Sequence, residues 1–193
     1  PDYAVTGVQT CALPIYGLNR FDGNEYRIFR NNSKDSKSIG NNFIRSIYED
    51  TDGQLWIGTD SRIYIYNSVT EDFSPFELQT ESGISINSAV TAICAENNNT
   101  IWIGTMAQGA FCYTKDLQKL EQFTENDRLN SLNSSLVWRI YKDLSETIWI
   151  GTRDGLSRFN RETLNFQTYR PANTLSITGD NEILSIYEDS DGD

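Results

Sequence analysis

The residue types that carry most enzyme chemistry are sparse in this sequence, which contains no histidine among its 193 residues. Without an imidazole, neither a Ser–His–Asp nor a Cys–His catalytic arrangement can form, and a Cys/His zinc site cannot be completed. The sequence also lacks a glycine-rich phosphate loop of the G-x-x-x-x-G-K type. We therefore expect this chain to hold no catalytic residue, no metal site and no cofactor.

Acidic pairs are the remaining candidates for catalysis. Glu49 with Asp50 and Glu188 with Asp189 have the composition of the two carboxylates that cleave a glycosidic bond. Both pairs, however, end similar apolar segments and lead into short polar connections. This position favours acids of turns and of the molecular rim over an acid/base pair.

Alternating acids near the end of the chain suggest a calcium loop, because Asp189, Asp191 and Asp193 have the spacing of its oxygen ligands. An EF-hand needs glycine at the sixth loop position and a distant glutamate, and Gly192 is wrongly placed for this role. The equivalent segments N-N-N-T and L-S-E-T lack the acids. A hairpin turn is therefore the favoured interpretation.

Three cysteines, Cys11, Cys94 and Cys112, form no C-x-x-C pair. Cys94 and Cys112 lie among apolar residues of strand-like segments, which favours buried free thiols over a disulfide.

The elements that must position any site are set by an internal repeat of about 46 residues. The segment L-W-I-G-T at residues 55–59 recurs as I-W-I-G-T at 101–105 and at 148–152. A second segment precedes each copy and begins at Ile44, Val90, Val137 and Ile183. Two aromatic segments follow each copy, so every period contains four elements in the same order.

Each element consists of four to seven mainly β-branched and aromatic residues between turn residues, which predicts a strand. Four short strands per repeat are typical of a propeller blade, whereas a solenoid is disfavoured because no segment has helical apolar spacing. We expect an all-β fold, a partial β-propeller of four-stranded antiparallel blades. The blade-packing candidates are Trp56, Gly58, Trp102, Gly104, Trp149 and Gly151.

Composition supports a soluble fold and limits its partners. Hydrophobic residues make up 38% of the chain and aromatic residues 12%, which suits half-buried pleated surfaces. The formal charge of -11 argues against nucleic acid as a partner, because binding polyphosphate needs clustered Lys and Arg. No segment of 18 apolar residues is present.

Both ends depart from the repeat. Residues 1–16 do not fit the register, and V-T-G-V-Q-T-C-A-L-P-I resembles a translated sequencing adapter, which would make Cys11 an artefact. A diverged strand or a signal remnant is the alternative. We expect residues 17–43 to form an outer half-blade and loop, residues 44–89, 90–136 and 137–182 to form three blades, and residues 183–193 to form the first strand of a truncated blade.

The pattern I-x-x-I-x-E-D-x-x-G-x-L-W-I-G-T, followed by G-L-x-x-F-N, resembles the two-component regulator propeller repeat over residues 17–193. The resemblance implies a periplasmic sensor region of an inner-membrane hybrid histidine kinase, whose kinase region and further blades lie elsewhere in the chain. It also implies an oligosaccharide ligand and a homodimer. Arg62 departs from the repeat because it occupies the position of Gly155.

Ligand-binding candidates lie in the loops between second and third strands and between blades, which converge on the mouth of a propeller channel. Their side chains can hydrogen-bond sugar hydroxyls or pair with uronate and sulfate groups. Trp138 is added because the repeat does not explain it, and it could stack on a sugar or pack in the channel. The loop candidates are Arg30, Asp60, Arg62, Gln108, Arg153 and Asp154.

Three functions remain open from the sequence. The first is a non-enzymatic ligand-sensing module of a membrane-anchored regulator. The second is a propeller enzyme of the polysaccharide lyase or lactonase type, which the lack of histidine weakens. The third is a protein-interaction scaffold.

Overall fold

The computed structural model describes residues 17–21, 23–126, 131–170 and 181–189. The expectations for residues 1–16, for Cys11 and for the acids Asp191 and Asp193 lie outside these residues. Within them, the fold is all-β and consists of antiparallel sheets. No helix of the described residues is long and apolar enough to cross a membrane.

Three four-stranded sheets follow one another along the chain, each with its strands in sequence order. The first contains β3 (Ile44–Glu49), β4 (Leu55–Thr59), β5 (Ile63–Asn67) and β6 (Asp72–Pro75). The second contains β7 (Val90–Asn97), β8 (Thr100–Thr105), β9 (Ala110–Thr114) and β10 (Lys119–Phe123). The third contains β11 (Val137–Lys142), β12 (Ile148–Thr152), β13 (Gly155–Asn160) and β14 (Asn165–Tyr169).

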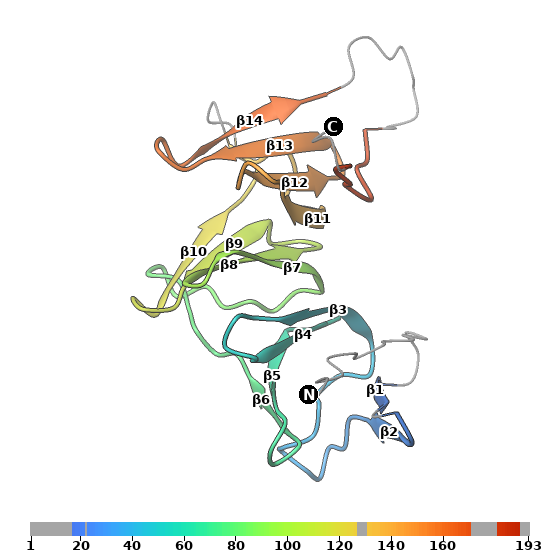
Figure 1. Ribbon diagram of the computed structural model, residues 1–193. Helices are drawn as coiled ribbons and strands as arrows, with labels where there is room; N and C mark the ends of the chain where they lie inside the picture. The colour runs from blue at the N-terminus through green and yellow to red at the C-terminus, as the bar shows by residue number, and fades with distance from the viewer. Residues whose placement is uncertain (1–16, 22, 127–130, 171–180, 190–193) are drawn as a thin grey trace.

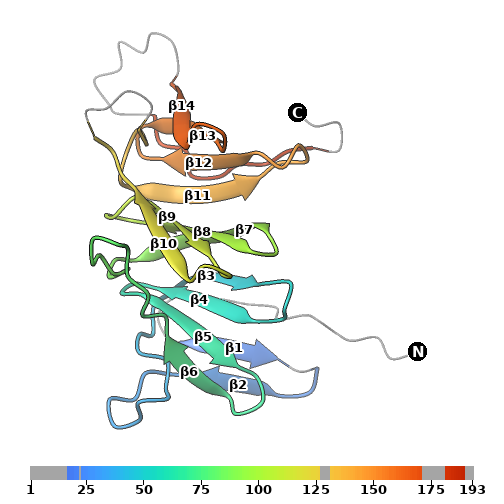
Figure 2. The same cartoon turned by 90° about the vertical axis from the view of Figure 1, so that its left-hand side faces the viewer.

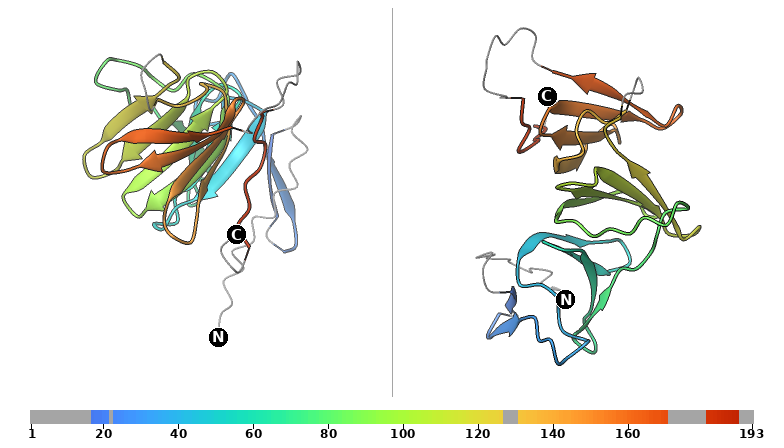
Figure 3. Two further views of the ribbon diagram at one scale, coloured as in Figure 1. Left: turned by 90° about the horizontal axis from the view of Figure 1, so that it is seen from above. Right: turned by 180° about the vertical axis from the view of Figure 1, so that it is seen from behind.

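A two-stranded sheet of β1 (Leu18–Phe21) and β2 (Tyr26–Phe29) precedes these three. Figures 1 and 2 show the sheets stacked face to face in chain order, and the rear view in Figure 3 shows that the array does not close on itself. The predicted fold class, a partial propeller of four-stranded antiparallel blades, is confirmed.

Residues 181–189 form no strand, in contrast to the expected first strand of a further blade. The segment still lies along the third sheet, because the Ile183 amide donates to the Thr152 carbonyl at 2.9 Å and the Tyr141 hydroxyl donates to Glu188 Oε2 at 3.2 Å. In the three complete sheets the first strand pairs with a Trp-Ile-Gly-Thr strand.

Tryptophan side chains fill the space between neighbouring sheets. Trp102 is completely buried and packs edge-to-face on Phe159 of the third sheet, with ring centroids 4.7 Å apart. Trp56 occupies the equivalent place and contacts Tyr113 of the second sheet at 5.9 Å. Trp149 has the same position on the third sheet but is only half-buried. Burying such large rings supplies much of the stabilising apolar contact.

The glycines of the Trp motif permit close approach of neighbouring sheets. A Cβ atom on Gly104 would lie 2.6 Å from Val137 of the third sheet, and one on Gly58 would lie 2.8 Å from Val90 of the second sheet. Gly151 faces Ile183 in the same way, with a Cβ-to-carbonyl distance of 2.8 Å. Larger residues would force these inner strands apart.

The long connections between sheets contain buried apolar anchors that the sequence analysis did not identify. Ile39, Ile86 and Leu132 are almost completely buried, although each lies in a polar connection. Each follows a serine, in S-I or S-L, at steps of 47 and 46 residues. The side chains therefore fix the loops that carry the rim residues to the sheets below.

The two described cysteines are free. Both lie opposite Trp102 in register, Cys94 on one neighbouring strand and Cys112 on the other. Their Cα atoms are thus separated by two strand spacings, about 10 Å, which exceeds the reach of a disulfide. Burial raises the pKa of the Cys112 thiol to about 12 and also raises that of Cys94. Both thiols should therefore be poor nucleophiles at neutral pH.

The β3–β4 hairpin attaches the first sheet to the second through an acid, a tryptophan and a cation. Asp50 Oδ2 accepts hydrogen bonds from Trp56 Nε1 at 3.0 Å and from Lys115 Nζ of the second sheet at 2.8 Å. Burial alone would raise the pKa of the Asp50 carboxyl, but hydrogen bonds from Lys115, Trp56 and the Gln54 amide together lower it below its ordinary value. The ionised carboxylate is therefore the form that holds the two sheets together.

Replacement of Asp50 by asparagine is expected to lower the free energy of unfolding by about 2 kcal/mol at pH 7, because charge-assisted hydrogen bonds contribute on this scale. The folded-state pKa of Asp50 is depressed. Its contribution is therefore complete above the unfolded pKa of about 4 and disappears as pH falls through the folded value. Urea unfolding between pH 7 and pH 3 should show the two proteins converging at acid pH. A difference that stays constant to pH 3 would contradict the assignment.

Candidate functional site at the rim

One end of the sheets carries the loops between second and third strands together with the long connections. The Asp60 amide donates to the Phe43 carbonyl at 3.1 Å, and the Arg153 amide donates to the Leu136 carbonyl at 3.0 Å. In the second sheet the Met106 amide makes the equivalent bond to Ala89. We call this end the rim. Its loops are therefore fixed at the same place in each sheet.

The first strand of each four-stranded sheet contains a β-bulge directly beside the rim. The register shifts between Ile44 and Ser46 in β3, and equivalent shifts occur in β7 and β11. The residues inside the bulges are Arg45, Thr91 and Trp138. A bulge turns a side chain away from the regular alternation of the strand, and bulges are frequent beside functional sites.

The three bulge residues differ in how their polar groups are used. Arg45 Nε donates to Asp60 Oδ1 in the loop of the same sheet. The Thr91 hydroxyl donates to the Val137 carbonyl of the neighbouring sheet at 2.7 Å. Trp138 Nε1 is buried and has no hydrogen-bond acceptor among the described residues. A buried donor without a partner costs about 1–3 kcal/mol, so it requires an explanation.

Comparison of equivalent positions in the sheets places Arg153 beside the Trp138 bulge. Asp60 and Arg153 occupy the same position, directly after Thr59 and Thr152 of the Trp motif. Because Arg45 contacts Asp60 in the first sheet, the equivalent residues Trp138 and Arg153 belong to the same corner of the third sheet. The guanidinium of Arg153 is largely exposed and lies 3.7 Å from Glu182. This corner therefore contains two hydrogen-bond donors, the exposed guanidinium of Arg153 and the buried indole N–H of Trp138.

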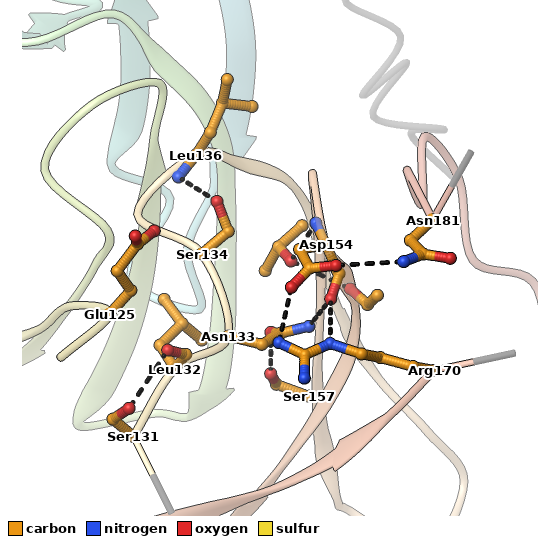
Figure 4. Close-up of polar contacts among 12 residues, drawn as sticks. Glu125, Ser131, Leu132, Asn133, Ser134, Leu136, Asp154, Ser157, Arg170 and Asn181 are labelled. Carbon is orange, nitrogen blue, oxygen red and sulfur yellow. Dashed lines mark hydrogen bonds and ion pairs between the residues drawn. The ribbon is translucent and has the colours of Figure 1, made fainter. Parts of the chain in front are cut away.

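Asp154 joins the rim loops of the third sheet (Figure 4). Its carboxylate accepts a hydrogen bond from Arg170 at 2.5 Å and from Asn181 Nδ2 at 3.1 Å. Its carbonyl accepts one from Asn133, whose side-chain oxygen in turn accepts the Ser157 hydroxyl. Sequence analysis missed Asn133, and its position after the buried Leu132 was the available signal. The carboxylate of Asp154 thus already accepts intramolecular hydrogen bonds.

The remaining candidates are separated from this corner. Gln108 bridges the loops of its own sheet, accepting from the Asn87 amide at 2.9 Å and donating to the Ser85 carbonyl at 3.0 Å. Arg62 forms no side-chain ion pair within the described residues. Arg30 follows the outer strand β2 and lines a cavity of about 360 Å³ with Asp72. Strand register and loop backbone therefore place Trp138, Arg153 and Asp154 at one corner of the rim, although no described side-chain contact joins Trp138 to the other two. The other four candidates lie elsewhere.

A cavity of about 960 Å³ lies at the opposite ends of the strands, and none of the seven candidates lines it. It is bordered by residues of the second and third sheets that include Glu96, Arg161 and Phe166. The described residues contain no group of three or more side chains that could hold a metal ion.

One copy of the repeat matches a known family of sequences. Residues 38–61, which include β3 and β4, match the family model described as the two component regulator propeller. The match covers a single repeat, and over these residues the chain is similar to that family. It is 40% identical over 130 residues to histidine kinase P4 of Formosa agariphila, covering 65% of this chain and 9% of that protein. The chain therefore corresponds to a small part of this relative.

Solved structures show the same arrangement of sheets. The extracellular domain of a hybrid two component system from B. thetaiotaomicron is 22% identical, with a TM-score of 0.67 over 80% of this chain and 20% of that chain. Virginiamycin B lyase from Staphylococcus aureus is 12% identical, with a TM-score of 0.62 over 92% of this chain and 55% of that chain. At these identities, the chain shares with them the fold alone.

Proposed function

We propose that this chain is part of the ligand-sensing propeller of a membrane-anchored two-component regulator and that an oligosaccharide binds at its rim beside Trp138. The observation that carries the proposal is the buried indole N–H of Trp138, which lacks an acceptor in the described residues. A ligand oxygen at this position would satisfy it. Ligand sites commonly combine an apolar surface with a few such convergent polar groups.

The chemistry of the corner favours a ligand rich in oxygen acceptors. Trp138 and Arg153 are donors, whereas the carboxylate of Asp154 already accepts from Arg170 and Asn181. A guanidinium pairs well with a carboxylate or sulfate, and an indole ring can cover the apolar face of a sugar. Acidic oligosaccharides, which carry uronate or sulfate groups beside hydroxyls, combine these features.

The regulatory part of the proposal is supported by the identity with a histidine kinase over 130 residues. We assign the chain to the periplasmic sensor region of an inner-membrane protein. Its kinase region and further blades belong to the same polypeptide, which acts as a homodimer. Binding at the rim would alter the relative position of two subunits and so regulate the kinase.

A propeller enzyme is less well supported. An inactive variant of virginiamycin B lyase has a histidine replaced by alanine, whereas the present chain contains no histidine. The sheets are shared with that lyase, but the chemistry of a histidine is not available from these residues. The proposal is therefore ligand binding without catalysis by this part of the protein.

Thermal-shift measurements on the full-length protein test this function. The probes are a uronate tetrasaccharide, a sulfated tetrasaccharide and neutral cellotetraose. We expect at least one acidic probe to raise the melting temperature and to bind about tenfold more weakly to Trp138→Phe, which keeps an aromatic ring but removes the N–H. Trp149→Phe is the matched control and should bind normally. Binding of no probe, or equal binding by both variants, would contradict the proposal.

A further inference from the structure

The hairpins opposite the rim contain a second repeated arrangement, in which a carboxylate accepts the indole N–H of the Trp motif. The distances from Nε1 to the carboxylate oxygen are 3.0, 3.0 and 2.7 Å in the first, second and third sheets. The pairs are Asp50 with Trp56, Glu96 with Trp102 and Asp143 with Trp149.

In two of the three sheets, a cation from the following sheet completes this arrangement. Lys115 Nζ lies 2.8 Å from Asp50, and Arg161 Nε donates to Glu96 Oε1 at 2.6 Å. Lys115 directly follows the third strand β9, and Arg161 directly follows the third strand β13. We call each set of acid, tryptophan and cation a staple, because it joins one sheet to the next.

The third staple is incomplete within the described residues. Asp143 accepts from Trp149 and from the Thr147 amide at 2.7 Å, but no described lysine or arginine pairs with it. On the same face, Tyr169 packs on Trp149 at 5.7 Å and is 40% exposed. Glu188, in the segment 181–189, accepts the amide of Leu144 in the adjacent β11–β12 hairpin at 2.8 Å. Within the described residues, this face therefore presents an aromatic surface and two acids that form no ion pair.

At the junction between the two-stranded sheet and the first four-stranded sheet, the order of charges is reversed: the earlier sheet supplies the cations and the later sheet supplies the acid. There Arg20 and Arg27 of the two-stranded sheet pair with Glu71, which lies in the β5–β6 hairpin of the first sheet. Ser68 occupies the position of Lys115 and Arg161 in this hairpin. A sheet with serine at this position would offer no cation to Asp50. The hairpin charges therefore distinguish one neighbour from another.

We propose that the charges of the staples determine which sheet can dock against which neighbour. The exposed face of the third sheet accordingly binds a four-stranded sheet of the same repeat that has lysine or arginine directly after its third strand. Mismatched partners are rejected by like-charge contact at the acid, which is an effective source of specificity. Such selection counters misassembly, a characteristic failure of repeat proteins whose units resemble one another.

The experiment supplies that partner in the same chain. A second copy of residues 100–123 is added after residue 193, so that the segment from Ile183 gains a second, third and fourth strand. Three versions carry lysine, serine or glutamate at the position that copies Lys115. Docking is measured as protection of Trp149 fluorescence from quenching by acrylamide. In these proteins every other tryptophan is replaced by phenylalanine. Circular dichroism at the melting transition confirms that each protein is folded.

We expect the lysine version to protect Trp149 and the glutamate version to dock about tenfold less often, with serine between them. Asp143→Lys should reverse this order, because it then attracts the glutamate. The reversed pair Asp50→Lys with Lys115→Asp should likewise regain stability that either single change loses. Equal protection by all three versions, protection by none, or no reversal by Asp143→Lys would overturn the proposal.

Discussion

Replacement of Trp102 by alanine is expected to lower the free energy of unfolding by about 3–5 kcal/mol, the cost of deleting a large buried aromatic side chain. Trp102 is completely buried, and its ring contacts Phe123, Phe159 and Phe166 on two sheets. The substitution would leave a cavity and would also remove the donor to Glu96. Equilibrium urea unfolding followed by circular dichroism measures the effect.

Trp149→Ala provides the matched control for this prediction. Trp149 occupies the same position of the repeat and makes the same indole bond to an acid, but its ring is only half-buried. We expect roughly half the loss found for Trp102, since the apolar area removed from water is smaller. Equal losses at the two sites would show that packing between sheets does not determine the stability of this array.

The second large effect is expected at Gly109, in the loop between β8 and β9. Its φ angle is +74°, and a Cβ atom would overlap the carbonyl oxygen of Phe123. Its amide also donates to the Ser135 carbonyl at 2.8 Å, which ties this loop to the connection leading to the third sheet. Gly109→Ala should therefore lower the free energy of unfolding by about 3 kcal/mol, from strain and steric overlap together.

Gly83→Ala separates these two causes. Gly83 has a φ angle of +82°, yet a Cβ atom there would meet nothing within 4 Å. We expect a loss of about 1 kcal/mol from backbone strain alone. Urea unfolding of both variants gives the comparison. If Gly83→Ala proved as damaging as Gly109→Ala, the close approach of the Phe123 carbonyl would not be the cause.

The strands were predictable because their side chains repeat in register. The segments beginning at Ile44, Val90 and Val137 and the Trp motifs all form strands close to the expected positions. The strand expected from Ile183 does not form, because sequence pattern reports only the tendency of a segment. A strand also needs partners for its backbone groups, and in the described residues 183–189 the bond from the Ile183 amide to Thr152 is not continued into a ladder.

The arrangement of the rim was less accessible from sequence. The loop residues were recognised by type, but type does not show whether a polar group is already used inside the protein. Gln108 and Asp154 had been expected to face a ligand, and both make internal hydrogen bonds. The bulge that turns Trp138 out of the strand depends on hydrogen-bond register, which the sequence pattern does not specify.

The staples had a sequence signal that was not recognised. Asp50 was interpreted as a turn or rim acid, and it lies in the β3–β4 turn, at the end opposite the rim. Its cation Lys115 lies 65 residues away, at the same separation as Arg161 from Glu96. Two equal long separations between opposite charges become meaningful only when neighbouring sheets are known to lie face to face.

The most direct test of the rim site is the nuclear magnetic resonance signal of the Trp138 indole N–H in the full-length protein. The account predicts a resonance at the chemical shift of an indole N–H without a hydrogen bond in the free protein. An acidic oligosaccharide that raises the melting temperature should shift this resonance downfield, while the Trp102 indole signal stays unchanged. An oligosaccharide that binds without altering the Trp138 signal would contradict the account.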